Sequence, residues 1–284
     1  MRKSILLIFS LFLAASSCSC ANNAKSDNST PMNNTDNCIK VEIKTTEGDI
    51  EIALFNETPH HRDNFVKLVN SGYYNGVLFH RVIKDFMIQT GDGSSKNAGP
   101  NAVLGSNDAG YKLDAEIVYP QFYHKYGAVA AAREGDDVNP EHKSSGSQFY
   151  IVTGQVYTQP QLDNLEQNMQ QRMLKTVFMK LVSAHKAEIT NYQVNGDSSA
   201  LEALRQKLID QTEAEVTKHP FAFTAEQKKA YTTVGGAPHL DGQYTVFGVV
   251  TKGMDVVNKI QNVATGEADR PIKDVRVISM KVLK

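Results

Sequence analysis

Residues 79–92, FHRVIKDFMIQTGD, form the stretch of this 284-residue chain that most restricts its fold. β-Branched and aromatic residues are frequent in and around it, which predicts two short strands at residues 77–83 and 86–90. Side chains two positions apart in a strand share a face. The segment therefore places polar and apolar side chains at fixed offsets along paired strands, namely Arg81, Phe86, Met87 and Gln89.

Strand patterns continue on both sides of this segment. Polar and apolar residues alternate at residues 39–45 and 50–54, and the turn residues between them predict a β-hairpin. Two isolated helices are expected, one opened by Thr58-Pro59 and the other at residues 254–261. Further strands are expected at residues 127–132, 149–153, 244–250 and 275–282. The pattern favours a mainly β fold with a closed or sandwiched antiparallel sheet, and a closed barrel capped by two helices fits it.

Residues 155–234 interrupt the strand pattern. Apolar residues recur at helical spacing over residues 162–181 and again over residues 201–216, which predicts two long helices. Capping-box spacing predicts helix starts at Ser199 and Thr224. Since strand patterning resumes after this region, we expect a helical insertion within one domain. The apolar stripe of the insertion is explained by packing between its own helices, with a surface for client proteins as the alternative.

The N-terminal residues have the pattern of an export signal. A short basic start precedes an apolar run that is too short to span a bilayer, so residues 1–17 are expected to be a signal peptide. Small residues lead directly to Cys18, which resembles the lipidated cysteine of bacterial lipoproteins; a plain secretory signal is the alternative. The polar residues 18–37 predict a flexible tether before a folded domain at residues 38–284. We therefore expect an exported protein, lipid-anchored to the cell envelope and facing the periplasm.

Composition argues against several classes of function. The formal net charge is −1, from 30 basic and 31 acidic residues, so no global field favours nucleic acid or an anionic membrane surface. The three cysteines, Cys18, Cys20 and Cys38, lie before or at the very start of the region that reads as folded. Neither a disulfide framework nor a thiolate metal site is therefore expected there.

Local motifs for other chemistries are also weak. His60, His61 and Asp63 lie at the start of an expected helix with no further ligand cluster, so exposed residues are favoured over a metal site. No G-x-S-x-G elbow is present, which argues against a serine hydrolase. His80 is adjacent to Arg81 and should point to the opposite face of its strand, where a hydrogen-bonded structural histidine is expected.

Three blocks of sequence carry a specific family resemblance. They are residues 79–92, residues 145–151 (SGSQFYI) and residues 239–248 (HLDGQYTVFG). In this order they resemble the cyclophilin-type peptidyl-prolyl cis-trans isomerases, over residues 39–154 and 235–284. The resemblance implies a cyclophilin-like barrel that acts on proline-containing polypeptides without a metal or another cofactor.

The resemblance also implies roles for individual residues. Arg81 matches the catalytic arginine of the family, and Gln89 matches a glutamine that orients the substrate. Substrate-binding roles fall on Phe86, Met87, Ala132, Arg133, Gln148, Tyr150, Leu240 and Tyr244. Tyr150 and His239 stand where the family often has Phe and Trp, so the floor of the pocket is expected to be more polar here.

Elementary chemistry explains why these residue types suit the reaction. Rotation about a peptide bond faces a barrier of about 18–20 kcal/mol because the nitrogen lone pair is delocalised into the carbonyl. A guanidinium that donates to the prolyl nitrogen as it pyramidalises stabilises the twisted state more than the planar one. We therefore expect an enzyme that accelerates the folding of exported proteins. A non-catalytic module that binds proline-containing segments is the alternative.

Overall fold

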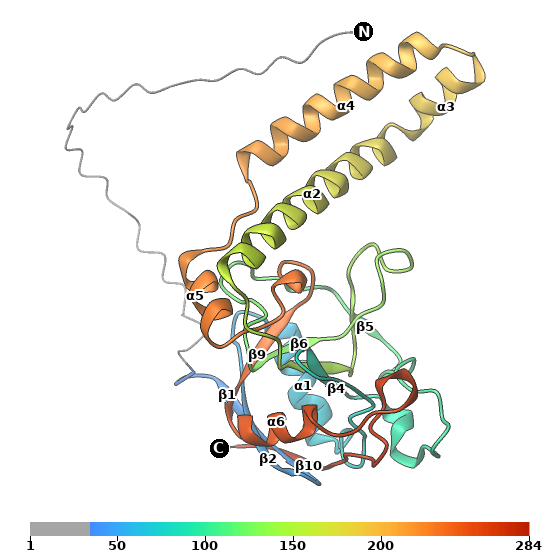
Figure 1. Cartoon of the computed structure of the whole chain (residues 1–284). Coiled ribbons are helices and arrows are strands. Elements are labelled where there is room, and N and C mark those ends of the chain that lie inside the picture. Colours follow the sequence, from blue (N-terminus) through green and yellow to red (C-terminus); the bar gives the residue numbers. More distant parts are fainter. Residues whose placement is uncertain (1–34, 284) are drawn as a thin grey trace, which may run out of the picture.

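The computed structural model describes residues 35–283, and its main feature is an eight-stranded sheet (Figure 1). The strand order is β10-β1-β2-β9-β6-β8-β4-β3, and all neighbouring strands are antiparallel. These strands are β1 (Ile39–Thr45), β2 (Gly48–Leu54), β3 (Arg81–Ile83), β4 (Met87–Thr90), β6 (Ala128–Ala131), β8 (Phe149–Val152), β9 (Val246–Lys252) and β10 (Val277–Val282). A separate pair is formed by β5 (Lys112–Leu113) and β7 (Ser144–Ser145). The predicted signal peptide and lipidation site lie outside the described residues.

The strand ladders form a half-barrel, and full closure into a barrel stays a prediction. Backbone hydrogen bonds from the Phe79 N–H to the Val275 carbonyl (2.9 Å) and from the Val277 N–H to the Val77 carbonyl (2.8 Å) join its two edges. Its edge strands are β10 and β3, and between them lies an isolated bridge that pairs Leu78 with Arg276. The strand expected at residues 77–83 is shortened to β3. Side chains take the place of ladder partners at Leu78, whose N–H donates to Ser95 Oγ (2.9 Å) and whose carbonyl accepts from Thr90 Oγ1 (2.8 Å).

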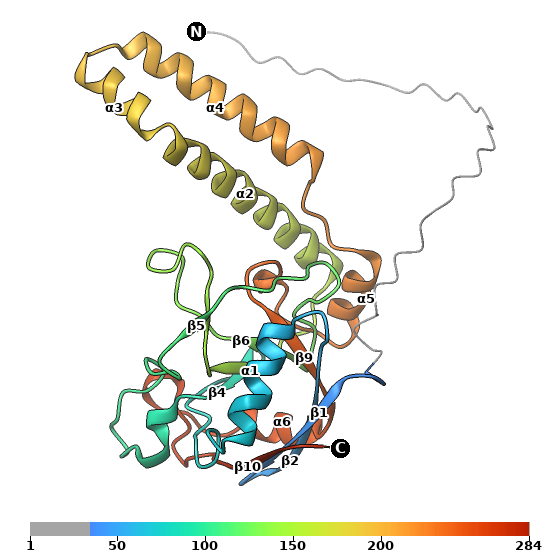
Figure 2. The same cartoon turned by 180° about the vertical axis from the view of Figure 1, so that it is seen from behind.

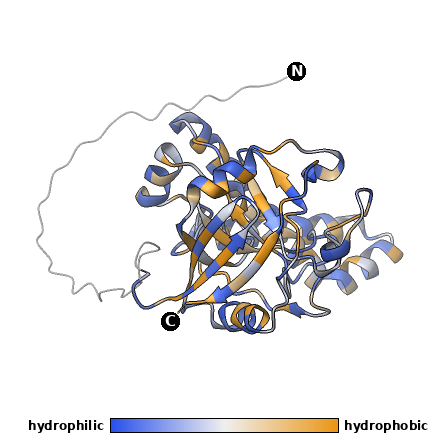
Figure 3. Ribbon diagram, turned by 90° about the horizontal axis from the view of Figure 1, so that it is seen from below, coloured by the Kyte–Doolittle hydropathy of each residue, from blue (hydrophilic) through white to orange (hydrophobic). Residues whose placement is uncertain are grey.

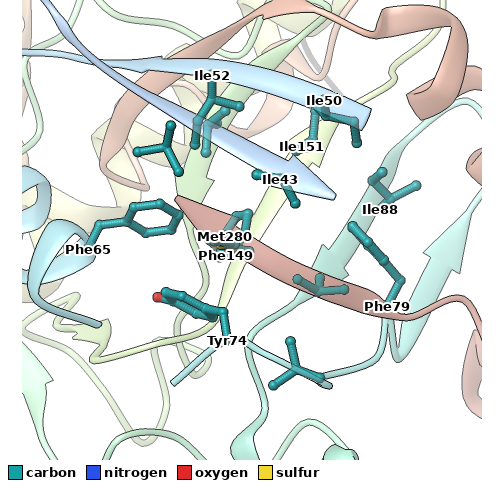
Figure 4. Packing of buried hydrophobic residues seen from close by; sticks show 14 of the residues in the cluster. Ile43, Ile50, Ile52, Phe65, Tyr74, Phe79, Ile88, Phe149, Ile151 and Met280 are labelled. Carbon is teal, nitrogen blue, oxygen red and sulfur yellow. The ribbon is translucent and has the colours of Figure 1, made fainter. Parts of the chain in front are cut away.

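The concave face of the sheet holds the main hydrophobic core (Figure 4). Ile43 of β1 and Ile50 of β2 are buried there against Phe65 of helix α1 (Pro59–Asn70). Helix α6 (Met254–Gln261) contributes further apolar side chains to the same cluster. Both helices lie where the sequence predicts them, and burial of their apolar faces holds them on the sheet.

The pairing register gives the sheet two different faces. Paired residues of antiparallel strands present their side chains on the same face. Val82 pairs with Ile88, and both join the main core. Arg81 pairs with Gln89, and Gln89 in turn pairs with Tyr150, so these three lie on the opposite face. Figure 3 shows the corresponding alternation of hydrophobic and hydrophilic residues along the strands.

Four helices occupy the insertion, where the sequence predicts two long helices and a further helix start at Thr224, so the chain is less purely β than predicted. They are α2 (Gln159–Ala184), α3 (Lys186–Val194), α4 (Ser198–Lys218) and α5 (Ala225–Thr233). In Figures 1 and 2, α2 and α4 run side by side as an arm that projects from the sheet, whereas α5 stays close to the sheet. Within residues 35–283, none of the helices is both long and apolar enough to span a bilayer.

The caps of these helices agree only in part with the sequence. The capping box at Thr224 is present, with its hydroxyl accepting from the Gln227 N–H (3.2 Å). The cap expected at Ser199 is wrong. Asp197 caps α4 instead, because its carboxylate accepts from the Ala200 N–H (2.9 Å).

The two ends of the insertion meet at a glycine. Gly236 forms backbone bridges with both Lys125 and Gln155. A Cβ at this position would lie 2.3 Å from the carbonyl oxygen of His124, far inside van der Waals contact. The absence of a side chain at Gly236 therefore allows the insertion to leave and re-enter the domain at one place.

Candidate active site

A cavity of about 1090 Å³ lies on the outward face of β3, β4 and β8. It is lined by every residue predicted for the site except Gln148, namely Arg81, Phe86, Met87, Gln89, Ala132, Arg133, Tyr150, Leu240 and Tyr244. The remaining walls come mainly from the segments around residues 98–105 and 266–274. The register that aligns Arg81, Gln89 and Tyr150 across three strands explains why residues so far apart in the sequence meet here.

Arg81 reaches the cavity with a guanidinium that is only lightly engaged. Its side chain is 42% exposed, and its Nε lies 3.6 Å from Asp269. An exposed pair at this distance is screened by water and contributes little stability. The guanidinium is therefore available to another acceptor at modest cost.

Gln148 supports the site from just behind the cavity wall. Its side-chain oxygen accepts from Gln89 Nε2 (3.0 Å), while its own amide nitrogen donates to the carbonyls of Gly105 (2.9 Å) and Asn107 (2.7 Å). These bonds fix the amide of Gln89 and tie the 98–105 segment to the sheet. Gln148 thus has a supporting position in this structure, and its contact with substrate stays a prediction.

The floor of the cavity is apolar and closely packed. Met87 is 2% exposed and Tyr150 is 4% exposed, and Phe86 lies at the rim with its ring 5.3 Å from that of His239. The Tyr244 ring meets Tyr150 edge-on at 6.0 Å. Such a surface suits a small saturated ring because burial of apolar area stabilises the contact.

Arg133 forms part of the wall and is already paired within the protein. Its guanidinium lies over the Tyr244 ring (4.4 Å), and Nε donates to the carbonyl of Gln243 (3.0 Å). Nη1 lies 2.7 Å from Asp136. These contacts hold Tyr244 in place, so Arg133 stabilises the shape of the cavity.

A buried hydrogen-bond network beneath the floor is not evident from the sequence. The Tyr150 hydroxyl lies 3.0 Å from His124 Nε2, and His124 Nδ1 lies 3.0 Å from Asp241 Oδ1. The other carboxylate oxygen of Asp241 accepts from the hydroxyl of Tyr231, in α5 of the insertion (2.6 Å). Burial holds the pKa values of Tyr150 and Tyr231 well above the usual value for tyrosine, so both stay protonated.

This network could have been anticipated from one residue. A tyrosine buried where the family often has phenylalanine needs a partner for its hydroxyl. The partners come from distant parts of the chain, however, so only the structure identifies them as His124, Asp241 and Tyr231.

Two of the sequence-based expectations for histidines are wrong. His80 is buried, as expected, but it lines the cavity, and within the described residues neither of its ring nitrogens has a hydrogen-bond partner. Desolvation lowers the pKa of His80, which favours the neutral ring. His61 is buried instead of exposed, and its Nδ1 lies 2.6 Å from Glu116 Oε2. Among residues 35–283, no group of three or more potential metal ligands is found.

Comparison with known proteins identifies the family of the chain. The sequence matches the family described as "Cyclophilin type peptidyl-prolyl cis-trans isomerase/CLD" over residues 39–204 and 216–282. A Staphylococcus haemolyticus protein named "Putative peptidyl-prolyl cis-trans isomerase" is 30% identical over 249 residues, covering 87% of this chain and 92% of the relative. A protein of the same name from Staphylococcus aureus strain USA300 is 30% identical over 246 residues, covering 86% and 91%.

Solved structures agree on the fold. A Cryptosporidium parvum cyclophilin type peptidyl-prolyl cis-trans isomerase matches with a TM-score of 0.50 at 20% identity, over 87% of this chain and 98% of that one. A structure of the same protein in the presence of the dipeptide ala-pro also gives a TM-score of 0.50, at 21% identity over 86% and 99%. The chain therefore belongs to the cyclophilin-type peptidyl-prolyl cis-trans isomerases.

Proposed function

We propose that this enzyme binds the proline ring of a polypeptide on the floor formed by Met87 and Tyr150, and that Arg81 assists rotation of the preceding peptide bond. The observation that carries the proposal is that a lightly engaged guanidinium and a buried apolar floor share one cavity. The C. parvum structure obtained in the presence of ala-pro supports a proline-containing substrate.

The proposed mechanism depends on binding the twisted state more tightly than the planar one. Rotation removes the amide delocalisation and places a lone pair on the prolyl nitrogen. The Arg81 guanidinium donates a hydrogen bond to that nitrogen, an interaction that the planar amide accepts poorly. Because the floor is apolar, the local dielectric is low and this charge-assisted bond is strengthened.

Gln89 is the proposed orienting residue. It is directly paired with Arg81 across β3 and β4, and its amide is held by Gln148. A fixed amide beside the guanidinium limits the geometries in which substrate and Arg81 meet. Binding of the rotating bond then costs less conformational entropy.

Isomerisation of a short X-Pro peptide tests this function. We expect the purified protein to accelerate isomerisation, and Arg81→Ala to lower kcat/KM by on the order of 100-fold, as for loss of one preorganised donor to a developing lone pair. Arg205→Ala is the matched control, because Arg205 is an exposed arginine of α4 that pairs only with Glu202 (3.0 Å) among the described residues. An Arg81→Ala protein as active as its parent would contradict the mechanism.

The setting that we propose is the outside of the cytoplasmic membrane, with proline-limited folding of exported proteins as the task. Its support is the sequence of residues 1–17 and the cysteine that follows, Cys18. Expression of the full chain and of Cys18→Ser, followed by detergent phase partitioning, tests the lipid anchor. The parent should enter the detergent phase and the variant should not; identical partitioning of both would contradict the proposal.

A further inference from the structure

A second hollow adjoins the candidate active site and is built largely by the insertion. It has a volume of about 380 Å³ and lies against the first turns of α2. Its lining residues are Tyr157, Pro160, Gln161, Asn164, Leu165, Asn168 and His239. Figure 1 shows these first turns of α2 close to the sheet, before the arm projects away. None of these residues belongs to the three blocks that resemble the family except His239.

His239 separates this hollow from the active-site cavity. It lines the hollow, and its ring lies 5.3 Å from the ring of Phe86 at the cavity rim. Arg172 of α2 donates to the carbonyl of His239 (3.2 Å), which ties the helix to this rim. The buried side chains of Leu162 and Met169 also anchor this part of α2 in the cluster that contains Tyr150. The two hollows therefore adjoin one another at His239, and buried side chains of α2 hold this region against the domain.

The lining of the hollow is suited to an uncharged peptide. It contains no acidic or basic side chain apart from His239, and burial lowers the pKa of His239, which favours its neutral form. Asn168 Nδ2 donates to Asn164 Oδ1 (2.8 Å). Within residues 35–283, that bond leaves Asn164 Nδ2 and Asn168 Oδ1 without protein partners, so one can donate to a peptide carbonyl and the other can accept from a peptide N–H. Tyr157 and Leu165 add apolar contact.

We infer that this hollow is a second subsite for the substrate polypeptide, which binds an uncharged segment of the chain on one side of the isomerising proline. The inference rests on the function proposed above. Only the rings of Phe86 and His239, with centroids 5.3 Å apart, lie between the two hollows, and an extended chain that advances about 3.3 Å per residue can pass them in a few residues. The helical insertion thereby makes the enzyme prefer long, uncharged segments over isolated X-Pro units.

Two peptides and two double variants test this inference. The short peptide has four residues with one X-Pro bond, and the long peptide has twelve uncharged residues around the same X-Pro bond. We expect Asn164→Ala/Asn168→Ala to lower kcat/KM for the long peptide by roughly five- to tenfold, the effect of losing two neutral hydrogen bonds, and to leave the short peptide unchanged. Alanine favours helix more than asparagine does, so the variant should fold. Gln167→Ala/Gln171→Ala is the matched control, since both are exposed amides of α2 outside the hollow.

Direct binding separates this inference from the proposed function. Fluorescence anisotropy with a labelled long peptide reports the subsite even if no isomerisation is seen, whereas failure to isomerise the short peptide contradicts only the proposed function. Weaker binding by the asparagine variant and not by the glutamine variant would support the subsite. Equal affinity and equal kcat/KM in both variants would overturn it. So would a parent dimer, seen by light scattering, that the asparagine variant alone abolishes, because a second copy of the chain would then occupy the hollow.

Discussion

Tyr231→Phe should destabilise the whole protein, although the residue lies in the insertion. Tyr231 is fully buried, and its hydroxyl donates to Asp241 Oδ2 at 2.6 Å. A hydrogen bond to a buried carboxylate contributes about 1.5–3 kcal/mol, and its loss leaves that oxygen without a donor. We expect the free energy of unfolding to fall by about 2 kcal/mol and Tm to fall by roughly 4–8 °C for a domain of this size.

Urea denaturation followed by tyrosine fluorescence and by circular dichroism measures this effect. Tyr192→Phe is the matched control, because the Tyr192 hydroxyl also donates to a carboxylate of the insertion, Glu188 (3.0 Å), but does so at the surface. The control should unfold at the same urea concentration as the parent. If Tyr231→Phe and Tyr192→Phe unfold alike, the buried network does not join the insertion to the domain, and the reasoning fails.

Three further substitutions probe other parts of the account. Tyr150→Phe removes the hydrogen-bond partner of His124 Nε2, so the free energy of unfolding measured in urea should fall by about 1–2 kcal/mol. The value of kcat/KM for a short X-Pro peptide should change less than about threefold, because the apolar floor remains. Desolvation lowers the pKa of His61 from its ordinary value of 6.5, so the unfolded chain binds a proton that the folded protein does not. Stability should be full above pH 6.5 and fall on acidification toward the lowered pKa, and His61→Gln should flatten this dependence; a slope unchanged by the substitution would show that His61 is not its source. Gly236→Ala should lower the free energy of unfolding by at least about 2 kcal/mol, because its Cβ would overlap a carbonyl oxygen. The control Gly99→Ala should be neutral, because no atom lies within 4 Å of its Cβ. Equal stability of the two variants would contradict the close approach at Gly236.

The sequence predicts much of the fold because local patterns coincide with the packing. Helix α6 (Met254–Gln261) has the predicted bounds, since its apolar residues recur at helical spacing and face the core. Strand lengths are predicted less well. The residues before Arg81 have strand composition, but the hydrogen bonds of Leu78 go to the side chains of Ser95 and Thr90, which periodicity does not reveal.

The sequence predicts which residues line the candidate site, but it does not predict the contacts that hold them in place. The family pattern identifies the residues that line the cavity. It can do so because the strand register brings residues at fixed sequence offsets to the same face of the sheet. The contacts behind them depend on long-range packing. His124 and Asp241 meet from distant parts of the chain, and Tyr231 joins them from the insertion. Buried His61 likewise contacts Glu116, which is distant in the sequence.

Deleting the whole insertion would not separate an effect on the subsite from an effect on the pocket floor. It would remove Tyr231, together with Leu162 and Met169, from the buried cluster that includes Tyr150. A loss of activity could then reflect a collapsed pocket floor instead of a lost subsite. Point substitutions on the exposed face of α2 keep that cluster intact, so they test the subsite alone.

In the proposed mechanism, Arg81 stabilises the rotating bond more than the bound ground state. The most direct measurement compares the parent with Arg81→Ala by exchange NMR on a saturating X-Pro peptide, with Kd measured on the same samples. We expect the rate of bound isomerisation to fall on the order of 100-fold while Kd changes by less than about threefold, because the apolar floor still holds the proline. A bound rate that stays at the parental value, with the loss confined to Kd, would contradict it.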